Sequence, residues 1–263
     1  MRMSVSRIAA VCCSLVLMVA PALCQDFQKS YSLSPGGRIS VKNVSGDIEV
    51  AGYNGSSVSA IAYREGRDRD KVEIIDESTA AQVDLRVRYA ENCNCDASVR
   101  FVLQIPLGTK YDFDSLSTAS GDIHIGHVSG KLAAKTASGN VTVSRVVGQI
   151  SISSASGDLQ IEEAVGSVIA RTASGDVEAT VRGEEGSGDL VFSSASGNVT
   201  VTIPSQSNAD VDISTASGEL RSDFPLTIEE RENRGKRAFG RIGTGTARLK
   251  ISSASGNVRL ART

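Results

Sequence analysis

Glycine recurs every nine residues through the middle of this 263-residue sequence, from Gly121 to Gly175. Alternate glycines stand in a Thr/Ser-Ala-Ser-Gly-Asp/Asn motif, whereas those between them are in looser surroundings, as in Val128-Ser129-Gly130-Lys131. The repeat unit is therefore 18 residues long and consists of two nine-residue halves. A fixed period of this kind is typical of architectures in which each unit packs against its neighbours.

Within each half, apolar and polar residues alternate. The residues two and four positions after each glycine of this series are apolar, and the residue directly after it is polar. The residue two positions before the glycine is also apolar, and we expect its alanines to lie inside, near the bend. Alternation with a period of two predicts short strands that bury one face. Sustained helical spacing is absent, so the chain is predicted to be all-β.

The repeat predicts a parallel β-solenoid, or β-helix, with 18-residue coils made of two nine-residue strand–turn units. Successive coils would stack about 4.8 Å apart. A sandwich of antiparallel hairpins is the alternative, but the 18-residue identity favours coils. Glycine suits the turns because it accepts a positive φ and a close approach of backbone. The predicted repeat turn residues are Gly46, Gly121, Gly139, Gly157, Gly175, Gly197, Gly218 and Gly256.

The first 24 residues have the features of a signal peptide. Arg2 and Arg7 precede an uncharged, mainly apolar stretch from Ile8 to Leu23, and small residues before Gln25 suit a signal peptidase. Cleavage after Cys24 is the favoured interpretation, and an uncut membrane anchor or a lipid-modified Cys24 are the alternatives. We therefore expect an exported protein of the periplasm or cell surface.

Three segments organise the chain. Residues 1–24 are the predicted signal peptide, residues 25–114 an irregular β part that caps the solenoid, and residues 115–263 the regular repeats. An insertion at 223–250 interrupts the repeats, and its stretch 229–237 is predicted to be a charged surface loop. Insertions around 64–70, 91–97 and 223–245 are the expected sources of specificity.

Two cysteines, Cys93 and Cys95, remain after the predicted cleavage. In an exported chain such a pair most often forms a disulfide, so the two are disulfide candidates. A redox or metal role is the alternative, but no other cysteine or nearby histidine in the sequence could complete a site.

The repeats, the segment Ile105-Pro106-Leu107-Gly108-Thr109 and the closing Gly240-Arg241-Ile242-Gly243-Thr244-Gly245 resemble the bacterial DUF4097 family, also labelled "putative adhesin". The resemblance covers nearly the whole mature chain. It implies a β-solenoid and a surface or envelope binding role, and it supplies no catalytic residues.

Composition and spacing exclude several kinds of chemistry. A net charge of −2 lacks the basic footprint of a nucleic-acid binder, and two histidines leave little room for a His-based metal centre or triad. Calcium is tempting because some nine-residue β-rolls bind it, yet Lys131, Gln149 and Ser167 follow alternate glycines. Adjacent acidic pairs, at 162–163 and 184–185, would point to opposite faces of a strand. We expect no catalytic, metal or cofactor site.

The sequence therefore predicts an exported, non-enzymatic β-solenoid that binds an envelope glycan, a membrane component or a protein in an adhesin-like way. Oligomeric state is left open. The alternatives are a β-helix enzyme that acts on polysaccharide and a structural spacer of the cell envelope.

Overall fold

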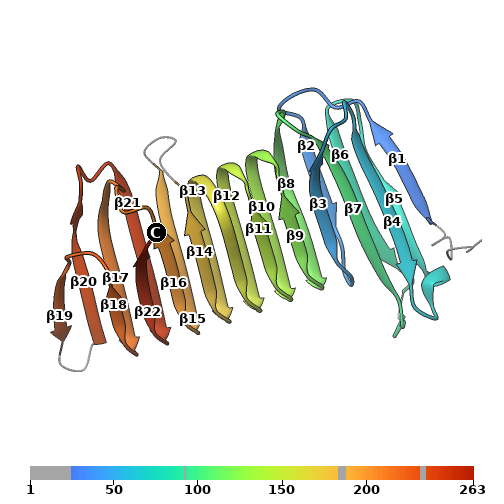
Figure 1. Cartoon of the computed structure of the whole chain (residues 1–263). Helices are drawn as coiled ribbons and strands as arrows, with labels where there is room; N and C mark the ends of the chain where they lie inside the picture. The colour runs from blue at the N-terminus through green and yellow to red at the C-terminus, as the bar shows by residue number, and fades with distance from the viewer. Residues whose placement is uncertain (1–24, 92, 183–187, 232–234) are drawn as a thin grey trace, which may run out of the picture.

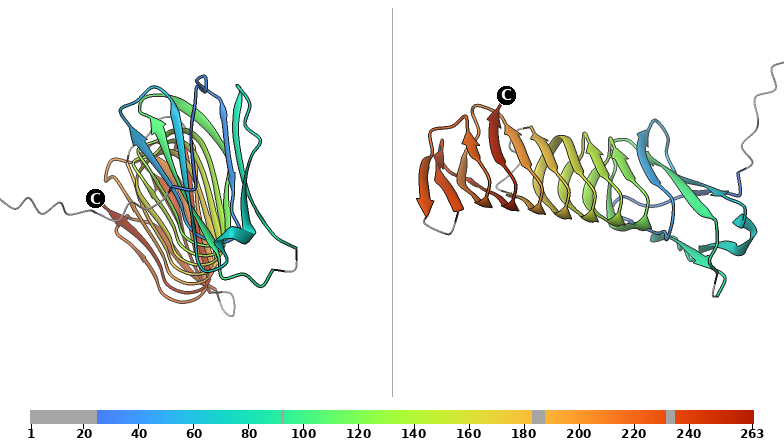
Figure 2. Two further views of the ribbon diagram at one scale, coloured as in Figure 1. Left: turned by 90° about the vertical axis from the view of Figure 1, so that its right-hand side faces the viewer. Right: turned by 90° about the horizontal axis from the view of Figure 1, so that it is seen from below.

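The computed structural model describes residues 25–91, 93–182, 188–231 and 235–263. Two long β-sheets face each other along an elongated solenoid, which confirms the predicted fold class (Figures 1 and 2). The described part contains one turn of 3₁₀ helix, η1 (Arg69–Lys71). No helix in it is both long and apolar enough to cross a membrane, and the predicted signal peptide, 1–24, lies outside the described residues.

The strands alternate between the two sheets. Sheet A consists, in spatial order, of β1 (Phe27–Tyr31), β4 (Val58–Glu65), β7 (Ser98–Pro106), β3 (Ile48–Tyr53), β9 (Ile123–Gly126), β11 (Val141–Ser144), the first part of β13 (Leu159–Ser174), β14 (Val177–Val181), β16 (Val199–Ile203), β22 (Val258–Arg262) and β18 (Leu220–Ser222). Sheet B consists of β5 (Val72–Asp76), β6 (Gln82–Tyr89), β2 (Arg38–Lys42), β8 (Lys110–Ser120), β10 (Ser129–Ser138), β12 (Val147–Ser156), the second part of β13, β15 (Asp189–Ser196), β21 (Ala247–Ser255), β17 (Ala209–Ser217), β20 (Gly235–Ile242) and β19 (Thr227–Arg231).

In the centre, successive coils stack in chain order with the predicted period. Ile123 pairs with Val141, Val141 with Leu159 and Leu159 with Val177, each 18 residues further along the chain. All these pairings are parallel. The inward side chains form apolar ladders that are almost completely buried between the sheets. Valine, isoleucine, leucine and alanine fill most of this thin core, and Phe101, Phe113 and Phe192 are the largest of its fully buried side chains.

At both ends the coil order differs from the chain order, contrary to the prediction that successive coils stack. The first coil, β2 and β3, lies between the coil of β6 and β7 and the coil of β8 and β9. The last coil, β21 and β22, likewise lies between the coil of β15 and β16 and the coil of β17 and β18. Each terminal coil is thus wedged between two coils that follow one another directly in the chain.

Antiparallel strands close the two ends. At the N-terminal end, β4 and β1 extend sheet A while β5 extends sheet B. At the C-terminal end, β20 and β19 extend sheet B. The prediction of a charged loop at 229–237 is therefore wrong for the described residues 229–231 and 235–237, because they lie on the two strands of this hairpin. The end of the predicted insertion is also corrected, since Ala247–Lys250 already belong to β21.

The alanines of the Thr/Ser-Ala-Ser-Gly motifs lie outside, not inside as predicted, whereas Ala164 before Gly166 is buried as predicted. Ala119, Ala137, Ala155 and Ala173 are exposed, whereas the residue before each of them is a buried threonine or serine. The last inward-facing side chain of each of these strands is therefore a threonine or serine, and the alanine and serine that follow it at the corner face solvent.

Candidate functional site

The predicted turn glycines form one column along the corner that joins sheet B to sheet A. All eight have a positive φ, between 107° at Gly46 and 155° at Gly139, Gly218 and Gly256. A Cβ on Gly139 would lie 2.0 Å from the carbonyl oxygen of Gly121 in the neighbouring coil. The glycines are therefore required by the stacking of the coils, and their repetition needs no ligand to explain it.

Buried hydroxyl groups connect neighbouring turns. Thr136 Oγ1 donates to the carbonyl oxygen of Gly121 at 3.1 Å, and Ser154 Oγ donates to Gly139 at 3.0 Å. The same bond recurs on both sides of the wedged C-terminal coil, where Ser253 donates to Gly197 and Thr215 to Gly256. The signal for this ladder is the hydroxyl residue that begins every motif, and the sequence prediction overlooked it.

The Asp/Asn residues after the glycines form a second ladder. The Asp122 carboxylate accepts the backbone N–H of Asn140 at 2.7 Å, and the Asn140 side chain accepts that of Asp158 at 2.8 Å. Each of these side chains thus has an oxygen committed to the next coil. Within the described residues no group of three or more His, Cys, Asp or Glu side chains could hold a metal ion.

The other residues singled out in the sequence lie apart from one another. His127 adopts a φ of 58° at the opposite corner, and its Nε2 accepts from Arg145 Nη1 at 2.7 Å, whereas His124 is on the outer face of sheet A. Glu163 makes ion pairs with Arg145 and Arg182. The acidic pair at 184–185 lies outside the described residues.

Two of the three predicted specificity segments, 64–70 and 91–97, meet at the N-terminal end. Arg67 Nε lies 2.8 Å from Asp96 Oδ2, and the backbone N–H of Asp96 donates to Asp68 Oδ2 at 3.0 Å. Hydrogen bonds from Lys71 and from this backbone N–H hold the pKa of Asp68 below its usual value. The third segment, 223–245, lies at the opposite end of the solenoid (Figure 1).

The candidate disulfide lies in the second of these segments. The structure pairs Cys93 with Cys95, with their Cα atoms 5.0 Å apart, within the range that a disulfide spans. Asp96, which pairs with Arg67, follows directly. A disulfide here would restrict the segment that carries Asp96, and its formation stays a prediction.

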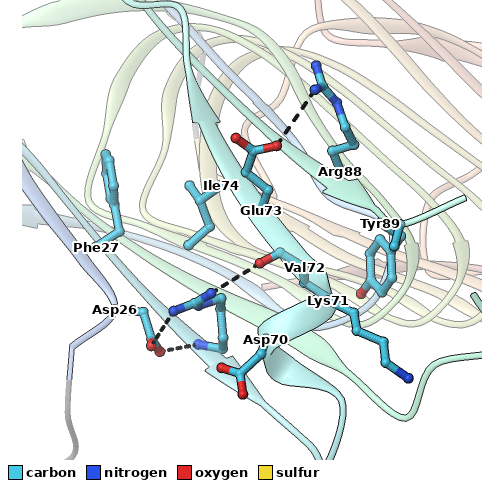
Figure 3. A pocket seen from close by; sticks show the side chains of 11 residues that line it. Asp26, Phe27, Asp70, Lys71, Val72, Glu73, Ile74, Arg88 and Tyr89 are labelled. Atoms are coloured by element: carbon cyan, nitrogen blue, oxygen red, sulfur yellow. Dashed lines mark hydrogen bonds and ion pairs between the residues drawn. The ribbon is translucent and has the colours of Figure 1, made fainter.

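Next to the place where segments 64–70 and 91–97 meet, a cavity of about 540 Å³ opens between the outermost strands of the two sheets at the N-terminal end (Figure 3). We call this opening, with its lining residues, the N-terminal mouth. Phe27 and Ile74 supply apolar surface on either side, and Asp70, Lys71 and Glu73 supply charge. Such a mixture of apolar and polar lining is typical of binding pockets.

Two polar clasps hold the sheets together across the mouth. In the first, Arg64 in β4 reaches Asp26 at 3.1 Å and the backbone carbonyl of Val72 in β5 at 3.2 Å. In the second, Lys29 and Tyr31 in β1 both reach the carboxylate of Asp76 in β5. The mouth therefore has a braced frame.

The second clasp shifts the pKa values of Asp76 and Tyr31 in opposite directions. Burial acts to raise the pKa of Asp76, but hydrogen bonds from Lys29, Ser78 and Tyr31 outweigh it and lower the pKa to about 2. Burial raises the pKa of the Tyr31 hydroxyl, and the nearby Asp76 charge adds to this. Asp76 is thus ionised, and Tyr31 neutral, throughout the physiological pH range.

The C-terminal end differs from the mouth because a side chain closes it. Phe224 is buried there, and Arg262 lies over its ring at 5.1 Å. On the outer face of the hairpin, Arg237 and Arg241 pair with Asp212 and Asp210. The third specificity segment is therefore occupied in capping the core.

Together these features define a non-helical repeat protein, a capped β-solenoid with a braced opening at one end. The chain belongs to the DUF4097 family, whose model, Toastrack DUF4097, matches residues 29–261. This confirms the family resemblance drawn from the repeats.

Two solved structures are similar to this chain at low sequence identity. A "putative cell adhesion protein" from Clostridium sporogenes ATCC 15579 is 11% identical, with a TM-score of 0.40 over 90% of this chain and 99% of that one. A "putative adhesin" from Bacteroides fragilis NCTC 9343 is 13% identical, with a TM-score of 0.40 over 89% and 96%. No curated protein matches the sequence.

Proposed function

We propose that this protein is an exported, non-enzymatic, adhesin-like binding protein that engages a component of the cell envelope or cell surface through its N-terminal mouth. The observation that carries the proposal is the meeting of segments 64–70 and 91–97 beside a cavity of about 540 Å³. Loops held on a rigid frame are a common place for binding residues. The two clasps supply that frame.

The charges at the mouth support binding more than catalysis. Glu73 lies 3.6 Å from Arg88 and Asp26 pairs with Arg64, so these carboxylates have basic partners. General acid–base work on a glycosidic bond uses two carboxyl groups facing a common substrate position. The mouth instead offers paired charges and apolar patches, which suit recognition of a partner of mixed polarity.

The test compares two variants that each remove one exposed ion pair and leave the net charge unchanged. Glu73→Ala/Arg88→Ala alters the mouth, and Glu230→Ala/Lys236→Ala removes a pair 3.3 Å apart at the opposite end. We expect the purified protein to co-sediment with isolated envelope material, and the mouth variant to bind several-fold more weakly than the control variant.

Four outcomes would contradict this proposal. No co-sedimentation by the unaltered protein would remove the binding function, and equal loss in both variants would remove the mouth as its site. Release of sugar fragments from the envelope material would favour the polysaccharide-acting enzyme instead. Concentration-dependent end-to-end assembly, without envelope binding, would favour the structural spacer.

A further inference from the structure

A second recess lies far from the mouth, in the central coils, along the corner at which the strands of sheet B begin. It has a volume of about 460 Å³ and crosses β8, β10, β12 and β13. Lys110, Lys131, Gln149 and Ser167 line it together with glycines of the looser half-repeats. At about 4.8 Å per strand, four strands give a groove on the order of 14 Å long, parallel to the solenoid axis. We call it the axial groove.

The axial groove exists because its glycines cannot be replaced by larger residues. Gly148 has a φ of 136°, and a Cβ there would lie 2.0 Å from the carbonyl oxygen of Gly130 in the neighbouring coil. No side chain can therefore fill this part of the groove. The groove therefore follows from the stacking of the coils, which the spacing of these looser glycines in the sequence does not reveal.

The charged residues that line the axial groove are all basic. Lys110 and Lys131 are exposed and take part in none of the ion pairs formed among the described residues. Asp112 is the register partner of Lys131 in β8, but it makes no ion pair with that lysine and does not line the groove. The groove therefore presents free ammonium groups at one end and the carboxamide of Gln149 further along.

The middle strands of the surrounding face are basic, whereas Asp112 and Asp114 on β8 and Asp189 at the start of β15 are acidic. The charged residues of β10, β12 and the second part of β13 are Lys131, Lys135 and Arg171, which are all basic. On sheet A of the same coils, Glu162 and Glu178 are acidic. The groove thus lies in a mainly basic part of sheet B, and the facing sheet A carries the acidic Glu162 and Glu178, although the whole chain has a net charge of −2.

We propose that the axial groove binds a linear, carboxylated polysaccharide that lies along the solenoid axis. Charge complementarity favours an anionic ligand, and the elongated recess across four strands suits an extended chain. The groove has no aromatic lining, so stacking on sugar rings would contribute little and ion pairing would dominate. This inference rests on the proposed binding function, but it concerns a separate surface and names a ligand class.

The experiment measures binding of the purified protein to polygalacturonate, with dextran as the uncharged comparison. Lys110→Gln/Lys131→Gln removes both charges from the axial groove. The matched control, Lys135→Gln/Arg171→Gln, removes two charges from the same face outside the groove. Melting temperature and circular dichroism establish that all variants are folded.

We expect the unaltered protein to bind polygalacturonate and not dextran, with weaker binding at about 0.5 M salt than at about 0.05 M. The groove variant should bind about tenfold more weakly, and the control variant less than about threefold. No binding to polygalacturonate, equal binding to dextran or equal loss in both variants would each overturn the assignment. Equally strong groove-dependent binding to single-stranded DNA or to anionic phospholipid vesicles would overturn the choice of a glycan.

Failure of this inference can be told apart from failure of the proposed function. Envelope binding that depends on Glu73 and Arg88 but persists without Lys110 and Lys131, together with no polygalacturonate binding, would reject the axial groove alone. Polygalacturonate binding that depends on Lys110 and Lys131, together with envelope binding that is unchanged in Glu73→Ala/Arg88→Ala, would retain the groove and reject the mouth.

Discussion

The central coils and the two ends of this solenoid are built from the same motif in different ways. From β8 to β16, each coil lies on the coil that precedes it in the chain. At the ends, β2–β3 and β21–β22 are wedged between coils from elsewhere in the sequence. The turn ladder nevertheless continues unbroken, because Asn257 accepts from Glu219 and donates to Asn198.

This comparison shows that the motif specifies how two coils join but not which two coils join. Each motif presents a side-chain donor (Asn43 before Gly46 and a Thr or Ser hydroxyl elsewhere), a turn glycine and usually an Asx side chain, so the same type of junction can form between different coils. Wedging a terminal coil in the interior leaves the outermost positions, except that of β18 in sheet A, to strands with irregular sequence and antiparallel pairing. Such ends are protected from the edge-to-edge association that regular, open coils would invite.

The largest effect is expected from removing the wedged C-terminal coil. Truncation after Thr246 deletes β21 and β22, which are the parallel partners of both β17 and β18. We expect the melting temperature to fall on the order of 10 °C or more, with β17–β20 becoming sensitive to protease. A chain that starts at Ser32, and so lacks the edge strand β1 together with the clasp residues Asp26, Lys29 and Tyr31, should lose less. An equal loss would show that the wedge has no special importance.

A smaller effect is expected from a single turn glycine of the central coils. Gly139→Ala places a Cβ 2.0 Å from the Gly121 carbonyl oxygen, so the coils must separate, and we expect a loss of about 3 kcal/mol in unfolding free energy. Gly108→Ala is the control, since it shares a positive φ of 76° but has nothing within 4 Å, and should cost about 1 kcal/mol. Denaturant unfolding measures both, and equal costs would refute the stacking argument.

The smallest effect concerns the second clasp at the N-terminal mouth. The pKa of Asp76 is lowered to about 2 in the folded protein, so the clasp stabilises the fold above about pH 4 and loses this contribution as the pH falls towards 2. Asp76→Asn should therefore reduce the unfolding free energy by about 1 kcal/mol at pH 7, with the difference shrinking near pH 2. A difference that stays constant with pH would contradict an ionised clasp.

Local chemistry explains how much of the fold was predictable. The alternation of Ile123, Ile125 and their equivalents identified the buried face, and the turn glycines identified the corners. The positions of the corner alanines were predicted wrongly, because the strand ends on Thr136 and its equivalents, whose hydroxyl groups are satisfied by a glycine carbonyl only once the coils are stacked. A buried hydroxyl with such a partner is acceptable, which residue type alone does not reveal.

The candidate sites were less predictable for the same reason. Segments 64–70 and 91–97 were expected to be important, but their convergence depends on contacts such as Arg67 with Asp96, 29 residues apart. The axial groove depends on stacking of Gly130 and Gly148, whose Cβ-free surfaces form a recess only when the coils are aligned.

The amino-acid sequence alone determined the coil length, the inward face of each strand and the glycine turns, because these follow from an 18-residue pattern of polarity and backbone freedom. The tertiary structure decided the order of the coils, the wedged termini, the braced mouth and the hairpin cap. Equivalent motifs are interchangeable neighbours, so local pattern cannot choose among them. That choice depends on the non-repeated strands at the ends, which pair only where the remaining edges are free.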